Sequence, residues 1–177
     1  MTVQDLVSVK EFTDEFIGMG YFSLRELQEI HTLSCKDELC SSFLAAEGEK
    51  LLGIRLSYAP GKWVTKARGL SLDKWSVSPQ RVGHFKSLFV HTENQGQGIG
   101  HKLSSTSIEC LKLMGAEGVV CHSWLESPGN SSQNYLKKMG FKTVAEHPMF
   151  WSTVDYICTR CGKGTCQCTA SEMILYF

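Results

Sequence analysis

Short apolar runs and helically spaced apolar positions alternate along most of the chain. Runs rich in β-compatible residues predict strands at 3–9, 42–46, 51–58, 85–90, 119–124, 142–147 and 173–177. Apolar residues at helical spacing predict helices at 10–19, 23–32, 99–114 and 132–139. Strands and helices that follow one another in this way predict an α/β domain.

Two of the predicted helices have recognisable ends, and one stretch has no regular pattern. Ser23 is a good N-cap with Glu26 three residues later, which makes a capping box. Gly140 suits the C′ position of the last helix, because glycine adopts a left-handed backbone at no steric cost. The stretch 59–80 predicts a solvated loop that is anchored by Trp63 and Trp75.

Composition adds little beyond the size of the protein. A chain of 177 residues predicts one domain, with 42% hydrophobic and 20% charged residues. Lysine plus arginine equals aspartate plus glutamate, 18 each, so nothing indicates attraction to nucleic acid or to a membrane surface. No apolar run is long enough to span a membrane, and the acidic N-terminal segment does not suit a signal peptide. We therefore expect a cytoplasmic protein, and the oligomeric state cannot be deduced.

A strand, a glycine-rich turn and a helix follow one another between residues 85 and 114. The apolar run at 88–90 is followed by polar residues and then by Gly96, Gly98 and Gly100. The first N–H groups of a helix have no partner within the helix and carry the positive end of its dipole. Glycines let an anion approach those groups. This order predicts a site for an oxyanion or a phosphate group at the start of the helix.

Two common phosphate motifs fit this turn poorly. A P-loop needs Gly-Lys-Ser/Thr after the glycines, and this chain has Gly100-His101-Lys102. A dinucleotide fingerprint needs G-x-G-x-x-G, and this chain has G-x-G-x-G from Gly96. A tight turn that binds no ligand is the remaining alternative.

A third motif fits better. The turn from Gln95 to Gly100 reads Q-x-x-G-x-G and follows the run Leu88-Phe89-Val90. It resembles the acyl-CoA-binding motif of the GNAT superfamily of N-acyltransferases. The Asn-containing turn 128–130, the short helix 132–139 and the closing Gly140-Phe141 are similar to the second signature of that family. The resemblance covers about residues 85–150.

This resemblance implies a fold and an activity. The fold is a mixed, mostly antiparallel sheet flanked by helices, in a single domain over 1–177. The activity is transfer of an acyl group, most simply acetyl from acetyl-CoA, to a primary amine. In the family the strand backbone binds the pantetheine arm and the turn binds the pyrophosphate. The CoA-binding residues so implied are Leu88, Phe89, Val90, Gln95, Gly96, Gln97, Gly98, Ile99, Gly100 and Asn130.

The catalytic groups are less clearly indicated. In GNAT enzymes the amine attacks the thioester directly, and a tyrosine four residues before the glycine of the second signature is commonly the acid. Leu136 holds that position here, and Tyr135 would point to a different side of the helix. The weak candidates for a base or an acid near the cleft are His84, His91, His122, Glu126 and Tyr135. Each of them is more often a structural residue.

The last four of the eight cysteines are closely spaced. Cys158, Cys161, Cys166 and Cys168 form C-x-x-C-x4-C-x-C, which suits four thiolates around a structural Zn²⁺. Free thiols, disulfides, a redox pair and an iron–sulfur cluster are the alternatives. Cys110 and Cys121 are expected to be buried apolar residues. Cys35 and Cys40 cannot be assigned from the sequence.

The cysteine segment 158–168 is an insertion between the strands of the predicted C-terminal hairpin. Because it lies far along the chain from the glycine turn, loss of the metal is expected to affect stability more than CoA affinity. The predicted function is an N-acetyltransferase that acts on an amine acceptor of unknown identity. The alternative is a non-catalytic CoA-binding or protein-interaction module that uses the zinc knuckle.

Overall fold

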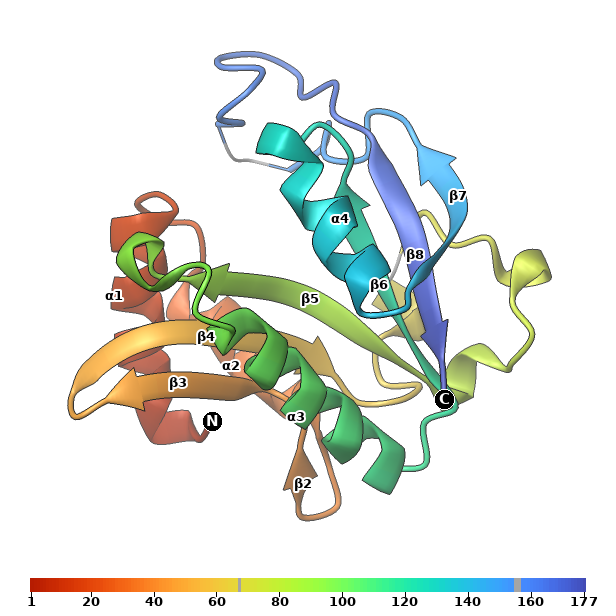
Figure 1. The fold of residues 1–177 in the computed structure, drawn as a ribbon, viewed down its shortest axis with the longest axis horizontal. Helices are drawn as coiled ribbons and strands as arrows, with labels where there is room; N and C mark the ends of the chain where they lie inside the picture. The colour runs from red at the N-terminus through yellow and green to blue at the C-terminus, as the bar shows by residue number, and fades with distance from the viewer. Residues whose placement is uncertain (67, 155–156) are drawn as a thin grey trace.

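A six-stranded sheet organises the structure, a computed structural model that describes residues 1–66, 68–154 and 157–177 (Figure 1). Its strands lie in the order β3-β4-β5-β6-β8-β7. Their bounds are β3 Phe43–Glu47, β4 Lys50–Tyr58, β5 Val82–Val90, β6 Gly118–Trp124, β7 Lys142–His147 and β8 Ala170–Tyr176. Among the described residues every strand pair except β5 with β6 is antiparallel, which confirms the expected mixed, mostly antiparallel sheet.

Four α-helices within the described residues pack on this sheet. Their bounds are α1 Leu6–Phe16, α2 Leu24–Ser34, α3 Ile99–Leu113 and α4 Ser131–Lys138. No helix within the described part of the chain is long and apolar enough to cross a membrane.

The parallel pair divides the sheet into a first half, β3-β4-β5, and a second half, β6-β8-β7. Strands β5 and β6 pair only as far as Phe85 and Cys121. Beyond that point β5 continues to Val90 and β6 continues to Trp124, and they no longer pair with each other. Figure 1 shows the two halves diverging from a point near the C-terminus. The backbone groups on the facing edges of the two strand ends are therefore left without a sheet partner.

Alternation along β4 assigns the two faces of the first half. Ile54 and Leu56 are fully buried and pack with apolar residues of α1 and α2. Arg55 lies between them and hydrogen-bonds Ser104 of α3. Successive side chains of a strand point to opposite faces, so α1 and α2 cover one face and α3 covers the other.

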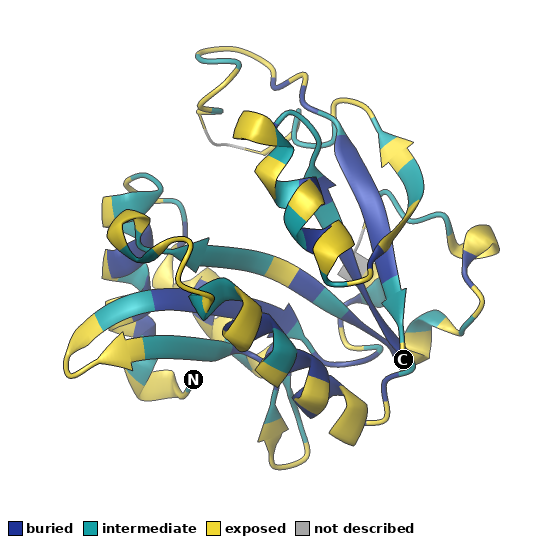
Figure 2. Ribbon diagram, viewed as in Figure 1, coloured by how far each residue is buried: buried dark blue, intermediate teal, exposed yellow. Residues whose placement is uncertain are grey.

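The loop 59–80 covers one face of the second half. Trp63 and Trp75 are buried and pack on Val82 of β5, Val120 of β6 and Ile174 of β8. Figure 2 shows β6 and β8 buried over most of their length. The prediction that two tryptophans anchor this loop is confirmed.

The predicted strand at 3–9 is wrong. Val3–Asp5 form a short 3₁₀ turn, and α1 starts at Leu6. The buried residues Leu6, Val9 and Phe12 recur every third position, whereas Val7 is 55% exposed. That spacing makes one apolar helical face, which packs against β4. A window of seven residues was too short to show the helical period.

The predicted caps and the C-terminal hairpin are confirmed. Ser23 and Glu26 form both hydrogen bonds of the capping box at the start of α2. Gly140 has φ +93°, and its N–H donates to Lys137 O at the end of α4. Strands β7 and β8 pair antiparallel. Local side-chain and backbone chemistry is sufficient to set these element boundaries.

A small hairpin pairs two cysteines that the sequence left unassigned. Strands β1 (Cys35–Lys36) and β2 (Leu39–Cys40) place Cys35 opposite Cys40, with Cα atoms 4.0 Å apart, and the two form a disulfide. Asp37 makes the reversal with φ +55°. A five-residue separation gives no pattern of its own, so only the hairpin register brings these thiols together.

Candidate active site

A large cavity lies where the two halves of the sheet separate. Its volume is about 1590 Å³. It is lined by the C-terminal half of β5, the glycine turn, the end of β6, the cleft-facing side of α4, the α1–α2 connection and part of the cysteine segment. One cavity therefore joins the predicted phosphate turn to residues on both faces of the sheet.

The glycine turn meets this cavity with its backbone uncovered. Gly96 and Gly98 have φ +77° and +80°, and a Cβ at either position would have no neighbour within 4 Å. Helix α3 starts directly after Gly98, which offers no side chain to cap the first amides. The side-chain amides of Gln95 and Gln97 fold back to Val90 O and Glu93 O, each 3.2 Å away. An anion can approach the first N–H groups of α3 here.

The predicted CoA residues do not all line the cavity. The run 88–90 does so, together with Gln95, Gly96 and 98–100. Gln97 and Asn130 are not among the lining residues. Asn130 instead stands at the start of α4 with φ +51°, where its side-chain amide donates to Gln133 Oε1 at 3.3 Å. Its position supports a turn-forming role.

Two of the candidate bases lie together in the cavity. His84 is stacked between Tyr58 and Trp63, and its Nδ1 is buried without a hydrogen-bond partner among the described residues. His122 Nε2 lies 2.7 Å from Gly69 O, and its ring centroid is 5.9 Å from that of His84. The Gly69 carbonyl can only accept, so Nε2 of His122 carries the proton and Nδ1 keeps its lone pair.

Both histidines are held in their neutral form. Burial, followed by repulsion from His122, lowers the pKa of His84 well below its ordinary value of 6.5. Burial also lowers the pKa of His122, although the carbonyl of Gly69 and the carboxylate of Glu172 oppose that shift. A neutral imidazole with a defined tautomer can accept a proton from a substrate.

His91 and Glu126 have structural partners. His91 Nδ1 accepts the N–H of Glu93 at 3.2 Å, and its ring packs on Phe16. Glu126 accepts the N–H of Thr169 with both carboxylate oxygens, at 3.0 and 3.1 Å. These contacts position the chain around the cavity, and neither residue is among those that line it.

Tyr135 and Leu136 differ sharply in their surroundings. Leu136 is 3% exposed and packs in the core between α3 and α4. The Tyr135 hydroxyl hydrogen-bonds Gly100 O at 2.9 Å and Ser104 Oγ at 2.7 Å, so it ties α4 to the start of α3. Ser104 Oγ also accepts from the buried guanidinium of Arg55. The motif position for an acid is therefore apolar, and the neighbouring phenol is hydrogen-bonded to α3.

Glu172, which the sequence analysis missed, is a buried carboxylate of β8 on the face of the sheet that the loop 59–80 covers. Its side chain is fully buried, and it accepts hydrogen bonds from Ser71 N, Trp75 Nε1 and His147 Nε2. Burial alone would raise its pKa, but these donors hold the pKa below its ordinary value of 4.5. The one signal in the sequence was an acidic residue directly before the apolar run 173–177 that ends the chain.

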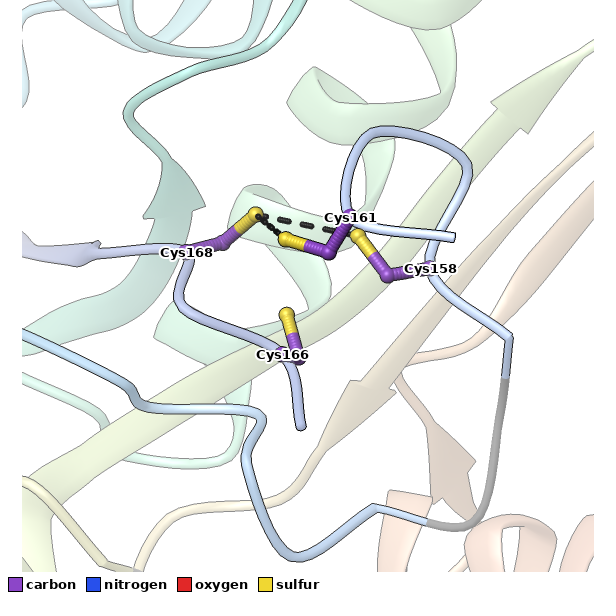
Figure 3. A group of neighbouring side chains, drawn as sticks. All are labelled: Cys158, Cys161, Cys166 and Cys168. Carbon is purple, nitrogen blue, oxygen red and sulfur yellow. Dashed lines mark hydrogen bonds between the residues drawn. The ribbon is translucent and has the colours of Figure 1, made fainter. Parts of the chain in front are cut away.

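The four cysteines of the C-terminal segment converge as predicted (Figure 3). All four Sγ atoms lie within 4.8 Å of one another. Cys168 Sγ is 3.7 Å from Cys158 Sγ and 3.6 Å from Cys161 Sγ. Sulfurs at Zn–S distances of about 2.3 Å around a tetrahedral ion stand roughly 3.8 Å apart. The spacing of the donors therefore fits such an ion.

A nearby donor fits thiolates in this cluster. The buried indole N–H of Trp124 lies near Cys168 and lowers the pKa of that thiol by favouring the thiolate, and it has no other hydrogen-bond acceptor among the described residues. Burial nevertheless raises the pKa of Cys168 to about 12. Without a cation this thiol therefore stays protonated, and a bound metal would convert it to a thiolate.

The cluster is close to the cavity, although it lies far along the chain from the glycine turn. Cys158, Cys166 and Cys168 line the same cavity as the glycine turn. Distance along the sequence suggested a remote element, but the β7–β8 connection folds over the open end of the sheet. The cysteine segment therefore forms part of the cavity wall.

Comparison with known proteins agrees with this geometry. Residues 40–143 match the family model of the acetyltransferase (GNAT) domain. No curated protein matches the chain in sequence. Many solved structures share its fold.

Three of these structures illustrate the likeness. The ribosomal-protein-S18-alanine N-acetyltransferase of Escherichia coli has a TM-score of 0.65 at 13% identity, over 99% of this chain and 90% of its own. The yncA protein of Salmonella typhimurium, solved with acetyl-CoA, has a TM-score of 0.66 at 16% identity, over 99% and 90%. Arabidopsis thaliana Naa50, solved with a bisubstrate analogue of CoA and a peptide, has 0.68 at 11% identity, over 100% and 95%. Likeness at these identities shows the fold alone.

Proposed function

The chain belongs to the GNAT acetyltransferase family, and from this membership we propose that it transfers an acetyl group from acetyl-CoA to a primary amine. The observation that carries the proposal is the uncovered start of α3, where two glycines with positive φ face a cavity between diverging strands. CoA brings a pyrophosphate for those amides and an extended arm for the unpaired edge of β5. The glycine turn and the run 88–90 would hold it, and acetyl-CoA supplies an activated thioester.

The side chains on the loop side suit the acceptor amine. His122 has a fixed tautomer that leaves the lone pair on Nδ1, so we assign it the proton that the amine loses. His84 lies beside it, and its low pKa makes it the weaker base. Attack is direct: the amine nitrogen bonds to the carbonyl carbon, and the sulfur leaves with the electron pair of the C–S bond.

The cysteine cluster is assigned to one structural zinc ion. Four thiolates fill a tetrahedral shell and leave no position for water or substrate, so the ion would hold the β7–β8 connection and supply no chemistry to the transfer. This role complements the transferase, because the connection forms part of the cavity wall.

Release of thiol from acetyl-CoA is the direct test of the proposed function. The acceptor panel should include small amines, lysine peptides and peptides with free N-termini, since the structures that share this fold include a ribosomal-protein-S18-alanine N-acetyltransferase and a protein bound to a bisubstrate analogue of CoA and a peptide. We expect amine-dependent thiol release with at least one class. If CoA binds and no amine releases thiol, the non-catalytic alternative is the better account.

Replacing Gly98 with tryptophan is expected to weaken CoA binding by about a hundredfold or more. The φ of +80° strains any side chain at this position, and an indole would fill the space that the phosphates need. Gly48→Trp is the matched control, because Gly48 also has positive φ and open surroundings but lies in the β3–β4 turn. Calorimetry with CoA measures both variants. Wild-type affinity in Gly98→Trp would show that the phosphate site lies elsewhere.

Replacing His122 with glutamine is expected to lower kcat/KM by about a hundredfold, the usual scale for a lost base. Its pKa lies below 6.5, so the imidazole is active above that pH and is protonated, and inactive, as the pH falls further. The wild-type rate should therefore fall on the acid side of pH 6.5, and the variant should lose that step with the same acceptor. His91→Gln should keep the wild-type profile, and an unchanged profile in His122→Gln would assign the base to another group.

A further inference from the structure

Arg55 carries a buried charge that no carboxylate of the described residues balances. Its side chain is 2% exposed, in the middle of β4. Nε and Nη2 donate to Ser104 Oγ at 3.1 and 2.7 Å, and the guanidinium lies 4.1 Å from the centre of the Phe85 ring. Within the described part of the chain no aspartate or glutamate forms an ion pair with it. A serine hydroxyl and an aromatic face position a guanidinium without neutralising it.

This charge faces the cavity at the point where the sheet divides. Arg55 lines the cavity, and Phe85 belongs to the last residue pair that joins β5 to β6. If the pyrophosphate lies at the glycine turn after Val90, the arm of CoA runs back along β5 toward that point. Its sulfur is the end of the arm. The guanidinium contacts the Phe85 ring at the sulfur end of the expected path, and its hydrogen-bond partner Ser104 lies in the second turn of α3.

Arg55 and His122 also stand on opposite faces of the sheet. Arg55 points to α3, whereas His122 hydrogen-bonds Gly69 in the loop on the other face. This separation suits direct transfer, because the amine and the departing sulfur occupy different positions on the tetrahedral carbon. The base and the positive charge would then act on the two ends of the same reacting centre.

We propose that Arg55 is a catalytic residue that stabilises, by charge, the CoA thiolate as it leaves. This inference rests on the proposed transferase function and adds a residue to it. As the C–N bond forms and the C–S bond breaks, the electron pair remains on sulfur, and the amine proton goes to His122. The guanidinium keeps all its protons. It takes the part that the tyrosine would play at the position of the buried Leu136.

The missing counter-ion is what favours this role over a structural one. A permanent carboxylate would neutralise the guanidinium before any substrate arrived. A charge held in place and left unbalanced is suited to an anion that appears only during the reaction. Burying an unbalanced charge lowers the stability of the folded chain, so replacing Arg55 with an apolar residue should not destabilise the protein.

The test is a titration of the thiol of bound CoA, followed by the ultraviolet absorbance of the thiolate. The complex with desulfo-CoA, which has no thiol, supplies the baseline for the cysteines of the protein. A free thiol has a pKa of about 8.5, and we expect wild-type protein to lower that of bound CoA by about one unit or more. Arg55→Met should abolish the shift, and Arg55→Lys should retain part of it. The control is Arg81→Met, which removes an exposed arginine paired with Glu117 and should match wild type.

Two further measurements separate this role from others. Arg55→Met should melt at or above the wild-type temperature, whereas a structural arginine would lower it. With a working acceptor, kcat should fall by about a hundredfold, the scale for a lost transition-state charge contact, with little change in KM. An unchanged pKa for the thiol of CoA bound to the wild-type protein would overturn the role of Arg55 and leave the proposed function standing. Failure of CoA to bind would overturn both. Tenfold tighter binding of succinyl-CoA than acetyl-CoA, lost in Arg55→Met, would instead assign the arginine to an acyl carboxylate.

Discussion

Replacing Glu172 with alanine is expected to lower the free energy of unfolding by about 3–5 kcal/mol, because each buried donor that loses its acceptor costs about 1–3 kcal/mol. The carboxylate is fully buried and accepts from three donor residues in two segments: Ser71 and Trp75 in the loop, and His147 at the end of β7. Alanine would leave these donors without an acceptor. Because the loop covers β5, β6 and β8, its loosening would also uncover their apolar face.

Urea unfolding measures this effect, and two further variants serve as a control and as an intermediate case. Glu146→Ala, an exposed neighbour in β7, should stay within about 0.5 kcal/mol of wild type. Glu172→Gln keeps the shape but not the charge, and should lie between wild type and Glu172→Ala. A loss of less than about 1 kcal/mol in Glu172→Ala would show that water replaces the carboxylate.

The same carboxylate predicts a pH dependence. Its folded-state pKa is below the ordinary 4.5, so its contribution to stability is present above that pH and is lost as the pH falls through the folded value. The difference in stability between wild type and Glu172→Gln should therefore shrink on the acid side of pH 4.5. A difference that stays constant down to low pH would assign the effect to packing.

Removing the metal from the cysteine cluster is expected to lower the free energy of unfolding by about 3 kcal/mol or more, roughly 10 °C in Tm. A single cross-link that closes a loop of this size contributes about that much, and four ligands constrain the chain further. Cys168→Ser should have a similar effect, because Cys168 is 1% exposed and contacts two other thiols. Since the cluster lines the cavity, activity with a working acceptor should fall with metal loss as well.

Elemental analysis of protein purified without added metal is the direct measurement, with one zinc per chain as the expected result. Cys110→Ser is the matched control: Cys110 is also buried, and its thiol donates to Cys40 O at 3.3 Å, which a serine hydroxyl can also do. It should retain zinc and melt close to wild type. Protein without zinc or iron, with four free thiols or two disulfides in this segment, would contradict the assignment.

The sequence by itself determined the features that depend on a few neighbouring residues. The capping box at Ser23, the C′ glycine at Gly140 and the positive-φ turn before α3 all follow from local backbone chemistry. Alternating apolar runs indicated the six strands of the sheet. The spacing of the last four cysteines was enough to predict that they converge. The strand predicted at 3–9 failed because its helical period emerges only over a longer window.

Only the tertiary structure decided which distant residues share the cavity. The parallel register of β5 with β6 sets His84 opposite Val120 and so brings it close to His122 on one face, whereas the alternation along β4 points Arg55 to the other. The fold also places Glu172 under the loop and the cysteine cluster beside the cavity. Strand order, register and the path of a long connection depend on contacts between residues far apart in sequence. Local patterns carry no information on which of those contacts form, so the partners of a buried charge become visible only in the folded chain.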